Sequence, residues 1–258
     1  MPTNENQNRE PGSAAREALL HAATAGADLI LAALAHLRGI PSPGGEPPWP
    51  PSLARQKESL HEWARSLALL LSAADILPRL QRGGQEHDFF LEGDRVVKVT
   101  RDGVFGFSPG IELALVSSSD DARRFHLWEA SPLEYLERLH LQNQLVPGLN
   151  LLVGIIEQEN DLAIVTSQPR FDIVPVTESE IDAWFARQGF QKVTTSGYYR
   201  AADNLAVFDA HTKNLVRFED DLIPFDVIPC RPDGGFLQFI EETLAAGHTL
   251  RAERRSTT

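Results

Sequence analysis

The sequence predicts an α+β fold, in which helices alternate with groups of short strands along the chain. Two segments before residue 76 have apolar residues at helical spacing, whereas the runs after it are rich in β-branched and aromatic residues. Ser131 and Thr177 each begin a capped-helix signature that interrupts these runs. The order is two helices, strands, helix, strands, helix, strands and a last helix near residues 236–246, which is typical of the α+β class.

The composition is that of a soluble globular protein, with 42% hydrophobic and 23% charged residues among 258. A formal net charge of −12 argues against broad binding to nucleic acid, because a phosphate backbone favours clustered Lys and Arg. The single cysteine, Cys230, excludes an internal disulfide. Residues 1–12 lack the features of a signal peptide, and the apolar run 27–37 is too short to cross a bilayer. We expect a cytoplasmic protein that binds no membrane.

The region 13–75 is predicted to form a helix pair. Its first helix runs from Ala14 to about Leu37, and its second from about residue 52 to 74, with the proline-rich linker 41–51 between them. We expect this pair to bury its leucine face against the rest of the chain or against a protein partner, and to contribute no catalytic side chain.

The second domain is expected over residues 76–248, between a disordered start at 1–12 and a flexible tail at 249–258. Gly93-Asp94 is a hairpin turn signal between two β-rich runs. The other expected elements are a loop or insertion at 101–130, a helix after Ser131, a hairpin at 151–168, a helix after Thr177 and a hairpin at 206–228.

The hairpin at 206–228 carries Asp209, Asn214 and Asp226. With a three-residue turn at 219–221, Asn214 would lie directly opposite Asp226, about 5 Å away between Cβ atoms. An amide oxygen and a carboxylate suit Mg²⁺, which prefers oxygen ligands. From these residues alone, a solvated acidic hairpin is an equally good interpretation.

Lys98 and two glycines extend this pattern upstream. Lys98 lies in the middle of a strand, where it would face away from both neighbouring valines. A lysine in a strand is most often a solvent-facing residue. Here, however, Gly83-Gly84 precedes it and would allow a backbone turn close to a phosphate.

The order of glycine turn, lysine strand, helix, two strands and D-x-H-x-x-N resembles the protein-kinase-like fold. "DAHTKN", residues 209–214, is similar to the loop of aminoglycoside- and choline-kinase-type phosphotransferases. Over residues 79–232 the chain resembles the polyvalent-protein-type kinase domains of phage and mobile-element proteins. The resemblance implies a compact two-lobed fold with a short C-terminal lobe, and an activity that uses ATP and Mg²⁺.

The resemblance also implies how ATP would bind. Gly83 and Gly84 would cover the phosphates, and Lys98 would hold the α- and β-phosphates. Glu137 would orient Lys98, with Glu134 as the second choice. Adenine would meet the backbone groups of a strand-end segment made of Val165, Thr166, Ser167 and Gln168.

For catalysis, the resemblance implies that Asp209, with His211 nearby, orients the attacking hydroxyl, while Lys98 acts on the phosphates. Asn214 and Asp226 would hold Mg²⁺. The acceptor would be a hydroxyl group of a protein or a small molecule.

Two other classes of function stay open. The glycine turn lacks the full G-x-G-x-x-G pattern, and Phe225-Asp226-Val227 stands where D-F-G is usual. A pseudokinase, or a nucleotide-binding docking module whose helix pair engages a protein, is the alternative. The third class is an interaction protein that binds no nucleotide.

Overall fold

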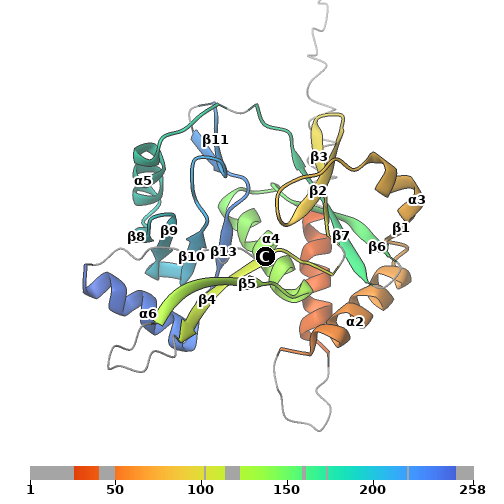
Figure 1. Cartoon of the computed structure of the whole chain (residues 1–258), viewed down its shortest axis with the longest axis horizontal. Helices are drawn as coiled ribbons and strands as arrows, with labels where there is room; N and C mark the ends of the chain where they lie inside the picture. Colours follow the sequence, from red (N-terminus) through yellow and green to blue (C-terminus); the bar gives the residue numbers. More distant parts are fainter. Residues whose placement is uncertain are drawn as a thin grey trace, which may run out of the picture.

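Helices and strands share the chain in the computed structural model, which confirms the α+β class (Figure 1). The first part of the first predicted helix, most of the proline-rich linker and both predicted flexible ends lie outside the described residues. The structure describes residues 26–40, 50–101, 103–113, 123–158, 161–172, 174–219 and 221–247.

A five-stranded sheet forms the centre of the first lobe, in the order β1-β6-β7-β3-β2. β1 runs parallel to β6, and the other neighbours are antiparallel. The Gly93-Asp94 turn joins β2 to β3 as predicted, because Glu92 pairs with Arg95 across it. The strands are β1 (Leu70–Leu71), β2 (His87–Glu92), β3 (Arg95–Thr100), β6 (Leu151–Glu157) and β7 (Leu162–Pro169).

The N-terminal helix pair is present and packs against this lobe. It consists of α1, described over residues 26–38, and α2 (Leu53–Ser66). The buried Leu34 and Leu60 share one core cluster with residues of α4 (Pro132–Leu145) and β6. The leucine face of the pair is therefore covered by the first lobe itself.

The second helix is shorter than predicted, because it ends at Ser66 and Ala68 takes a left-handed φ of 55°. Leu70 and Leu71, which were expected on its apolar face, instead form β1 and pair with Ile155 and Ile156. Pairing with a strand distant in the sequence overrides the local preference of leucine for a helix. The short helices α3 (Ala73–Ile76) and η1 (Leu77–Arg79) then lead to the glycine turn.

Both capped helices begin where the sequence predicts. The Ser131 hydroxyl accepts a hydrogen bond from the Glu134 N–H, and the Glu134 carboxylate accepts one from the Ser131 N–H at 2.8 Å. Thr177 and Glu180 repeat this capping box at α5 (Glu178–Arg187). Each box satisfies two backbone donors that a helix start leaves unpaired.

The segment 101–130, which was predicted as a loop or insertion, contains two strands, and the prediction is wrong for them. They are β4 (Phe107–Leu113) and β5 (Arg123–Glu129), which pair as an antiparallel ribbon. Pro109 and Gly110 are typical loop residues, yet the ring of Trp128 packs over the glycine, where a side chain would crowd it. The ribbon reaches the second lobe, where Phe125 stacks on Phe208 with 4.5 Å between ring centroids.

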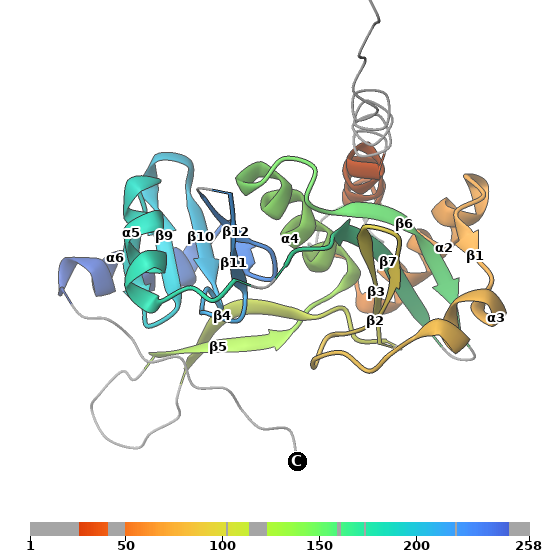
Figure 2. The ribbon, with the colours of Figure 1, turned by 90° about the horizontal axis from the view of Figure 1, so that it is seen from above.

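The second lobe contains a four-stranded sheet in the order β13-β10-β9-β8, covered on opposite faces by α5 and α6 (Gly234–Ala245) (Figure 2). The other elements of this lobe are β8 (Gln191–Thr194), β9 (Gly197–Arg200), η2 (Ala201–Asp203), β10 (Leu205–Phe208), β11 (Leu215–Phe218), β12 (Asp221–Pro224) and β13 (Ile228–Cys230). Across the described ranges, every helix is too short or too polar to span a membrane.

Candidate functional site

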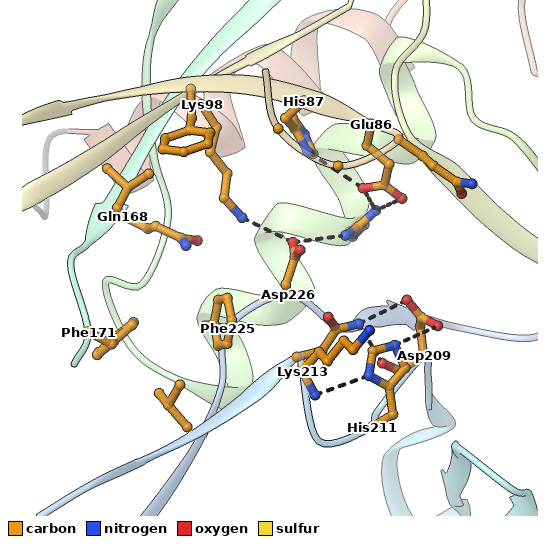
Figure 3. A pocket seen from close by; sticks show the side chains of 18 of the residues that line it. Glu86, His87, Lys98, Gln168, Phe171, Asp209, His211, Lys213, Phe225 and Asp226 are labelled. Atoms are coloured by element: carbon orange, nitrogen blue, oxygen red, sulfur yellow. Dashed lines mark hydrogen bonds and ion pairs between the residues drawn. The ribbon is translucent and has the colours of Figure 1, made fainter. Parts of the chain in front are cut away.

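A cavity of about 920 Å³ lies between the two lobes (Figure 3). The glycine turn and β3 line it from the first lobe, and the segment after β10 with the end of the β11–β12 hairpin lines it from the second. Residues 168–171, which form the end of β7 and the two residues after it, make up the third side of the cavity. This volume lies within the range of small-molecule and cofactor sites.

The glycine turn lines the cavity next to β2. An isolated bridge between Gln81 and Phe89 closes the turn, and the Gly83 N–H donates to the Asp88 carboxylate at 3.1 Å. A side chain at Gly83 would overlap the carbonyl oxygen of His87, so only glycine fits there. Gly84 has open space around it.

Lys98 and Asp226 meet at the inner end of the cavity, with 3.0 Å between Nζ and Oδ1. The Lys98 side chain is 16% exposed and that of Asp226 is 36% exposed, and the exposed part of Asp226 belongs to the cavity. Burial alone would raise the pKa of Asp226, but the charges of Lys98 and Arg138 outweigh it and hold the pKa well below its ordinary value. Asp226 is therefore a carboxylate.

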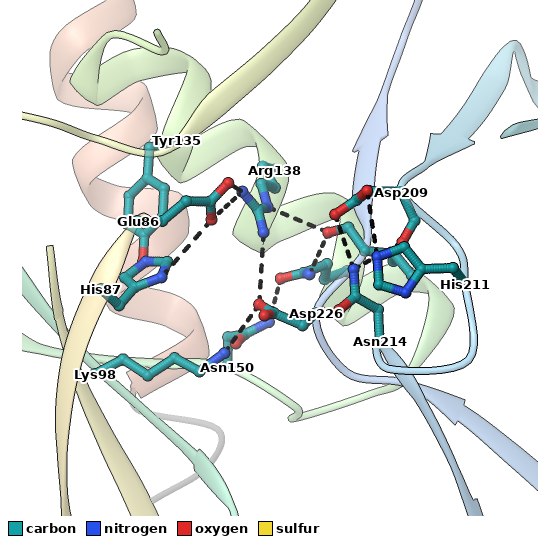
Figure 4. A network of polar contacts seen from close by, with 12 residues as sticks. Glu86, His87, Lys98, Tyr135, Arg138, Asn150, Asp209, His211, Asn214 and Asp226 are labelled. Atoms are coloured by element: carbon teal, nitrogen blue, oxygen red, sulfur yellow. Dashed lines mark hydrogen bonds and ion pairs between the residues drawn. The ribbon is translucent and has the colours of Figure 1, made fainter. Parts of the chain in front are cut away.

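Arg138 of α4 and its partner Glu86 are site residues that the sequence analysis missed (Figure 4). The Arg138 guanidinium donates two hydrogen bonds to the Glu86 carboxylate, at 2.9 and 2.8 Å, and lies 3.6 Å from Asp226. It also donates to the Val227 carbonyl at 3.2 Å, which ties the loop carrying Asp226 to α4. Burial raises the pKa of Glu86, and the charge of Arg138 opposes this shift.

A signal for Arg138 was present in the sequence. It lies three residues after Tyr135 and four before Gln142, on the face of the helix that all three share. An arginine on a buried helix face needs a buried acid as its partner.

The predicted partners of Lys98 lie elsewhere. The Glu137 carboxylate accepts a hydrogen bond from Arg38 of α1 at 2.6 Å, and Glu134 belongs to the capping box of α4. Glu137 directly precedes Arg138, and successive helical residues point about 100° apart. The arginine therefore faces the cavity while the glutamate faces away from it.

Asp209 opens a tight loop and has a left-handed φ of 56°, which is unusual for a residue other than glycine. The Asn214 side-chain amide donates to the backbone carbonyl of Asp209 at 2.7 Å and to its carboxylate at 2.9 Å. His211 Nδ1 accepts from the Lys213 N–H, which leaves the Nε2 proton of a neutral ring facing Asp209 at 3.5 Å. The loop therefore fixes the direction of the Asp209 carboxylate.

The predicted register of the hairpin is wrong by one residue. Leu215 pairs with Pro224 and Phe218 with Asp221, so Asn214 is not directly opposite Asp226. The chain compensates, because the Asn214 carbonyl accepts from the N–H groups of both Phe225 and Asp226, at 3.1 and 3.3 Å. Asn214 and Asp226 thus remain neighbours.

These two residues fit a magnesium ion that also binds phosphate. The Asn214 nitrogen is engaged by Asp209, which leaves its amide oxygen as a ligand beside the Asp226 carboxylate. In the described part of the chain, no three His, Cys, Asp or Glu side chains cluster closely enough to hold a metal alone. Mg²⁺ in phosphate sites commonly uses one or two protein oxygens together with the substrate.

The predicted adenine-binding segment lies too far into the strand. Val165, Thr166 and Ser167 are paired with β3 on one side and β6 on the other, so their backbone is enclosed by the sheet. Of the four predicted residues only Gln168 lines the cavity, followed by Pro169, Arg170 and Phe171. The sequence did not reveal that β7 continues to Pro169.

One family model matches the chain, over residues 118–228. It describes a serine/threonine/tyrosine kinase found in polyvalent proteins. The matched segment includes α4, Gln168, Asp209, Asn214 and Asp226. No curated protein and no solved structure matches the chain.

Proposed function

We propose that this chain, which carries a kinase domain of the polyvalent-protein type, is an ATP- and Mg²⁺-dependent phosphotransferase acting on a hydroxyl group of a protein or a small molecule. The observation that carries the proposal is the convergence of Lys98, Arg138 and Asp226 at one end of a nucleotide-sized cavity, which Asp209 also lines. Cations, a carboxylate ligand and a candidate base are the parts that phosphoryl transfer requires.

The two cations would bind the phosphates of ATP. In the nucleotide-free protein Lys98 and Arg138 are neutralised by Asp226 and Glu86. A triphosphate entering beside the glycine turn replaces these carboxylates as the partner of the cations. Arg138 would therefore bind phosphate together with Lys98, which was expected to do so alone.

Asp226 and Asn214 would hold the metal ion. Mg²⁺ bound there neutralises the charge of the phosphate oxygens during transfer. Within the protein, Val227 keeps Asp226 in place, since its carbonyl accepts hydrogen bonds from both Arg138 and Gln142 of α4.

Asp209 would act on the acceptor. Its carboxylate takes the proton of the hydroxyl while the hydroxyl oxygen bonds to the γ-phosphorus and the bond to the leaving ADP oxygen breaks. Asn214 holds the carboxylate, and His211 lies on its other side. The left-handed φ of Asp209 is the kind of backbone strain that functional sites retain.

The alternative is a nucleotide-binding docking module without transfer activity. Such a module would use the Lys98–Asp226 pair for the nucleotide in the same way, but it would need no base. The two functions differ in what Asp209 contributes, so Asp209 decides between them.

The experiment compares Asp209→Asn and Asp226→Asn with the wild type by isothermal titration with MgATP and by phosphate release or autophosphorylation. Asp209→Asn should keep MgATP affinity and lose turnover by about 10²–10⁴-fold. Asp226→Asn should lose affinity itself. Asp75→Asn, an exposed acid on α3, is the control and should behave as wild type.

Three outcomes would contradict the proposal. Absence of MgATP binding by the wild type excludes both nucleotide-binding functions. Unaltered turnover in Asp209→Asn removes its catalytic role. Equal loss of affinity in both variants makes Asp209 a metal ligand.

A further inference from the structure

Gln168 presents an unpaired acceptor at the end of β7. Its side chain is 4% exposed, and Oε1 is buried without a hydrogen-bond partner. Buried polar side-chain atoms nearly always have partners, because an unpaired one loses its hydration without compensation. Gln168 lines the cavity, and Figure 3 shows its amide pointing into it. The cavity is therefore where a partner for Oε1 would lie.

The backbone beyond Gln168 is poorly equipped to bind a base. Pro169 has no N–H group, and the Arg170 N–H donates to the Asp94 carbonyl at 2.8 Å. Two consecutive residues at the cavity wall therefore offer no available donor. At these two residues a hydrogen-bond donor to a ligand has to come from a side chain.

The surroundings of Gln168 suit a flat aromatic ring. Phe171 and Phe225 also line the cavity, with 6.2 Å between their ring centroids, and in Figure 3 both lie below the Gln168 amide. Lys98 Nζ lies 5.9 Å from the Phe225 ring centroid, so the cationic end of the cavity is adjacent. A base against these rings would have its phosphates directed towards Lys98.

We propose that the side-chain amide of Gln168 recognises the base of the nucleotide. An amide presents an acceptor oxygen beside a donor NH₂, which matches the amino group and neighbouring ring nitrogen of adenine. Oε1 accepts from the amino group, and Nε2 donates to the ring nitrogen. A base without the amino group leaves the buried Oε1 unpaired.

This inference rests on the proposed function, and its test uses Gln168→Met, which keeps the length of the side chain and removes both polar groups. The nucleotide-free variant should unfold at a temperature roughly 2–8 °C higher, because a buried unpaired acceptor is lost. Its affinity for ATP should fall by about 10- to 100-fold. Its affinity for inorganic tripolyphosphate should not change. The variant should thus gain stability and lose affinity for ATP. If Gln168 were only structural, its replacement would not change the two quantities in opposite directions.

Gln142→Met is the matched control for stability. Gln142 is equally buried, but its amide donates to the Val227 carbonyl at 2.7 Å and accepts from Asn150 at 2.8 Å. Removing these satisfied groups should lower the unfolding midpoint. A second comparison uses purine riboside triphosphate, which lacks the amino group, and the wild type should bind it more weakly than ATP.

Wild-type protein that binds neither ATP nor tripolyphosphate would overturn the proposed function and this inference together. Wild-type binding of ATP with undiminished affinity in Gln168→Met would overturn the base assignment alone. A lower unfolding midpoint in Gln168→Met would make Gln168 a structural residue. Equal wild-type affinity for ATP and purine riboside triphosphate would overturn the contact between Oε1 and the amino group.

Discussion

Replacing Glu86 with glutamine should destabilise the nucleotide-free protein and at the same time tighten its binding of ATP. Glu86 is the main partner of Arg138, which lies 2.8 Å from it and 3.6 Å from Asp226. Without that negative charge Arg138 keeps Asp226, 3.6 Å away, as its counter-ion among the described residues. The phosphates of ATP, however, no longer meet a competing carboxylate.

The magnitudes follow from the burial of the pair. Arg138 and Glu86 have side chains that are 5% and 13% exposed, and removing one partner of a buried pair costs roughly 3–5 kcal/mol. Glutamine still accepts one hydrogen bond and Asp226 remains, so we expect about 3 kcal/mol, or an unfolding midpoint roughly 6–12 °C lower. Two charges about 6 Å apart interact by about 3 kcal/mol at an effective dielectric constant near 20. Screening by Arg138 reduces this, and we expect ATP to bind about tenfold more tightly.

Thermal unfolding without nucleotide and isothermal titration with ATP measure the two effects. Glu137→Gln is the matched control. It makes the same change at the residue next to Arg138, where the carboxylate forms a half-exposed pair with Arg38. It should alter neither quantity by much. Weaker ATP binding in Glu86→Gln would refute the reasoning. It would mean that Glu86 positions the Arg138 guanidinium and does not compete with the phosphates.

Two further predictions concern the glycine turn and its neighbour. Gly83→Ala should lower both the unfolding midpoint and MgATP affinity, because its methyl group overlaps the His87 carbonyl, whereas Gly84→Ala should be close to wild type in the same titrations. Similar losses in the two variants would contradict this. His87 has its pKa lowered from 6.5 to about 3, by burial first and then by Lys98. Between these values the unfolded chain binds a proton that the folded protein does not, so wild-type stability should fall as pH drops below 6.5, by about 1.4 kcal/mol per pH unit. The stability difference between wild type and His87→Gln should therefore narrow by about 2–3 kcal/mol from pH 6.5 to 4.5 in denaturant titrations, and a constant difference would exclude this linkage.

Features that depend on neighbouring residues could be predicted from the sequence. The capping boxes at Ser131 and Thr177 and the turn at Gly93-Asp94 form from residues within one or two turns of chain, so local chemistry determines them. Lys98 could also be assigned to the middle of a strand, because β-branched valines precede and follow it.

Features that depend on residues distant in the sequence could not be predicted. Leu70 belongs to a strand only because β6 is available to pair with it, and the helical spacing around it gives no sign of that. The β4–β5 ribbon pairs through Pro109 and Gly110, which locally favour a loop. The hairpin register depends on the number of residues in one turn, and acidic residues alone do not determine whether that number is two or three.

The site shows the same division. Asp209 and Asn214 belong to one short loop, and their contact follows from spacing. Glu86 and not Glu137 is the glutamate of the site, because Arg138 is the residue of α4 that faces the cavity. The rotation of α4 that decides this is set by its packing against both lobes.

The β4–β5 ribbon also limits how the molecule can deform. The lobes are joined by the chain after β7, at residues 170–177, and again by this ribbon, which leaves β3 in the first lobe and packs on Phe208 in the second. Helix α4 adds a third attachment, because Arg138 and Gln142 both donate to the Val227 carbonyl of the second lobe. Attachments at three separate places oppose rotation as well as sideways displacement of one lobe against the other. Lys98 and Asp226 are therefore held opposite each other by the whole frame and not by their own ion pair alone.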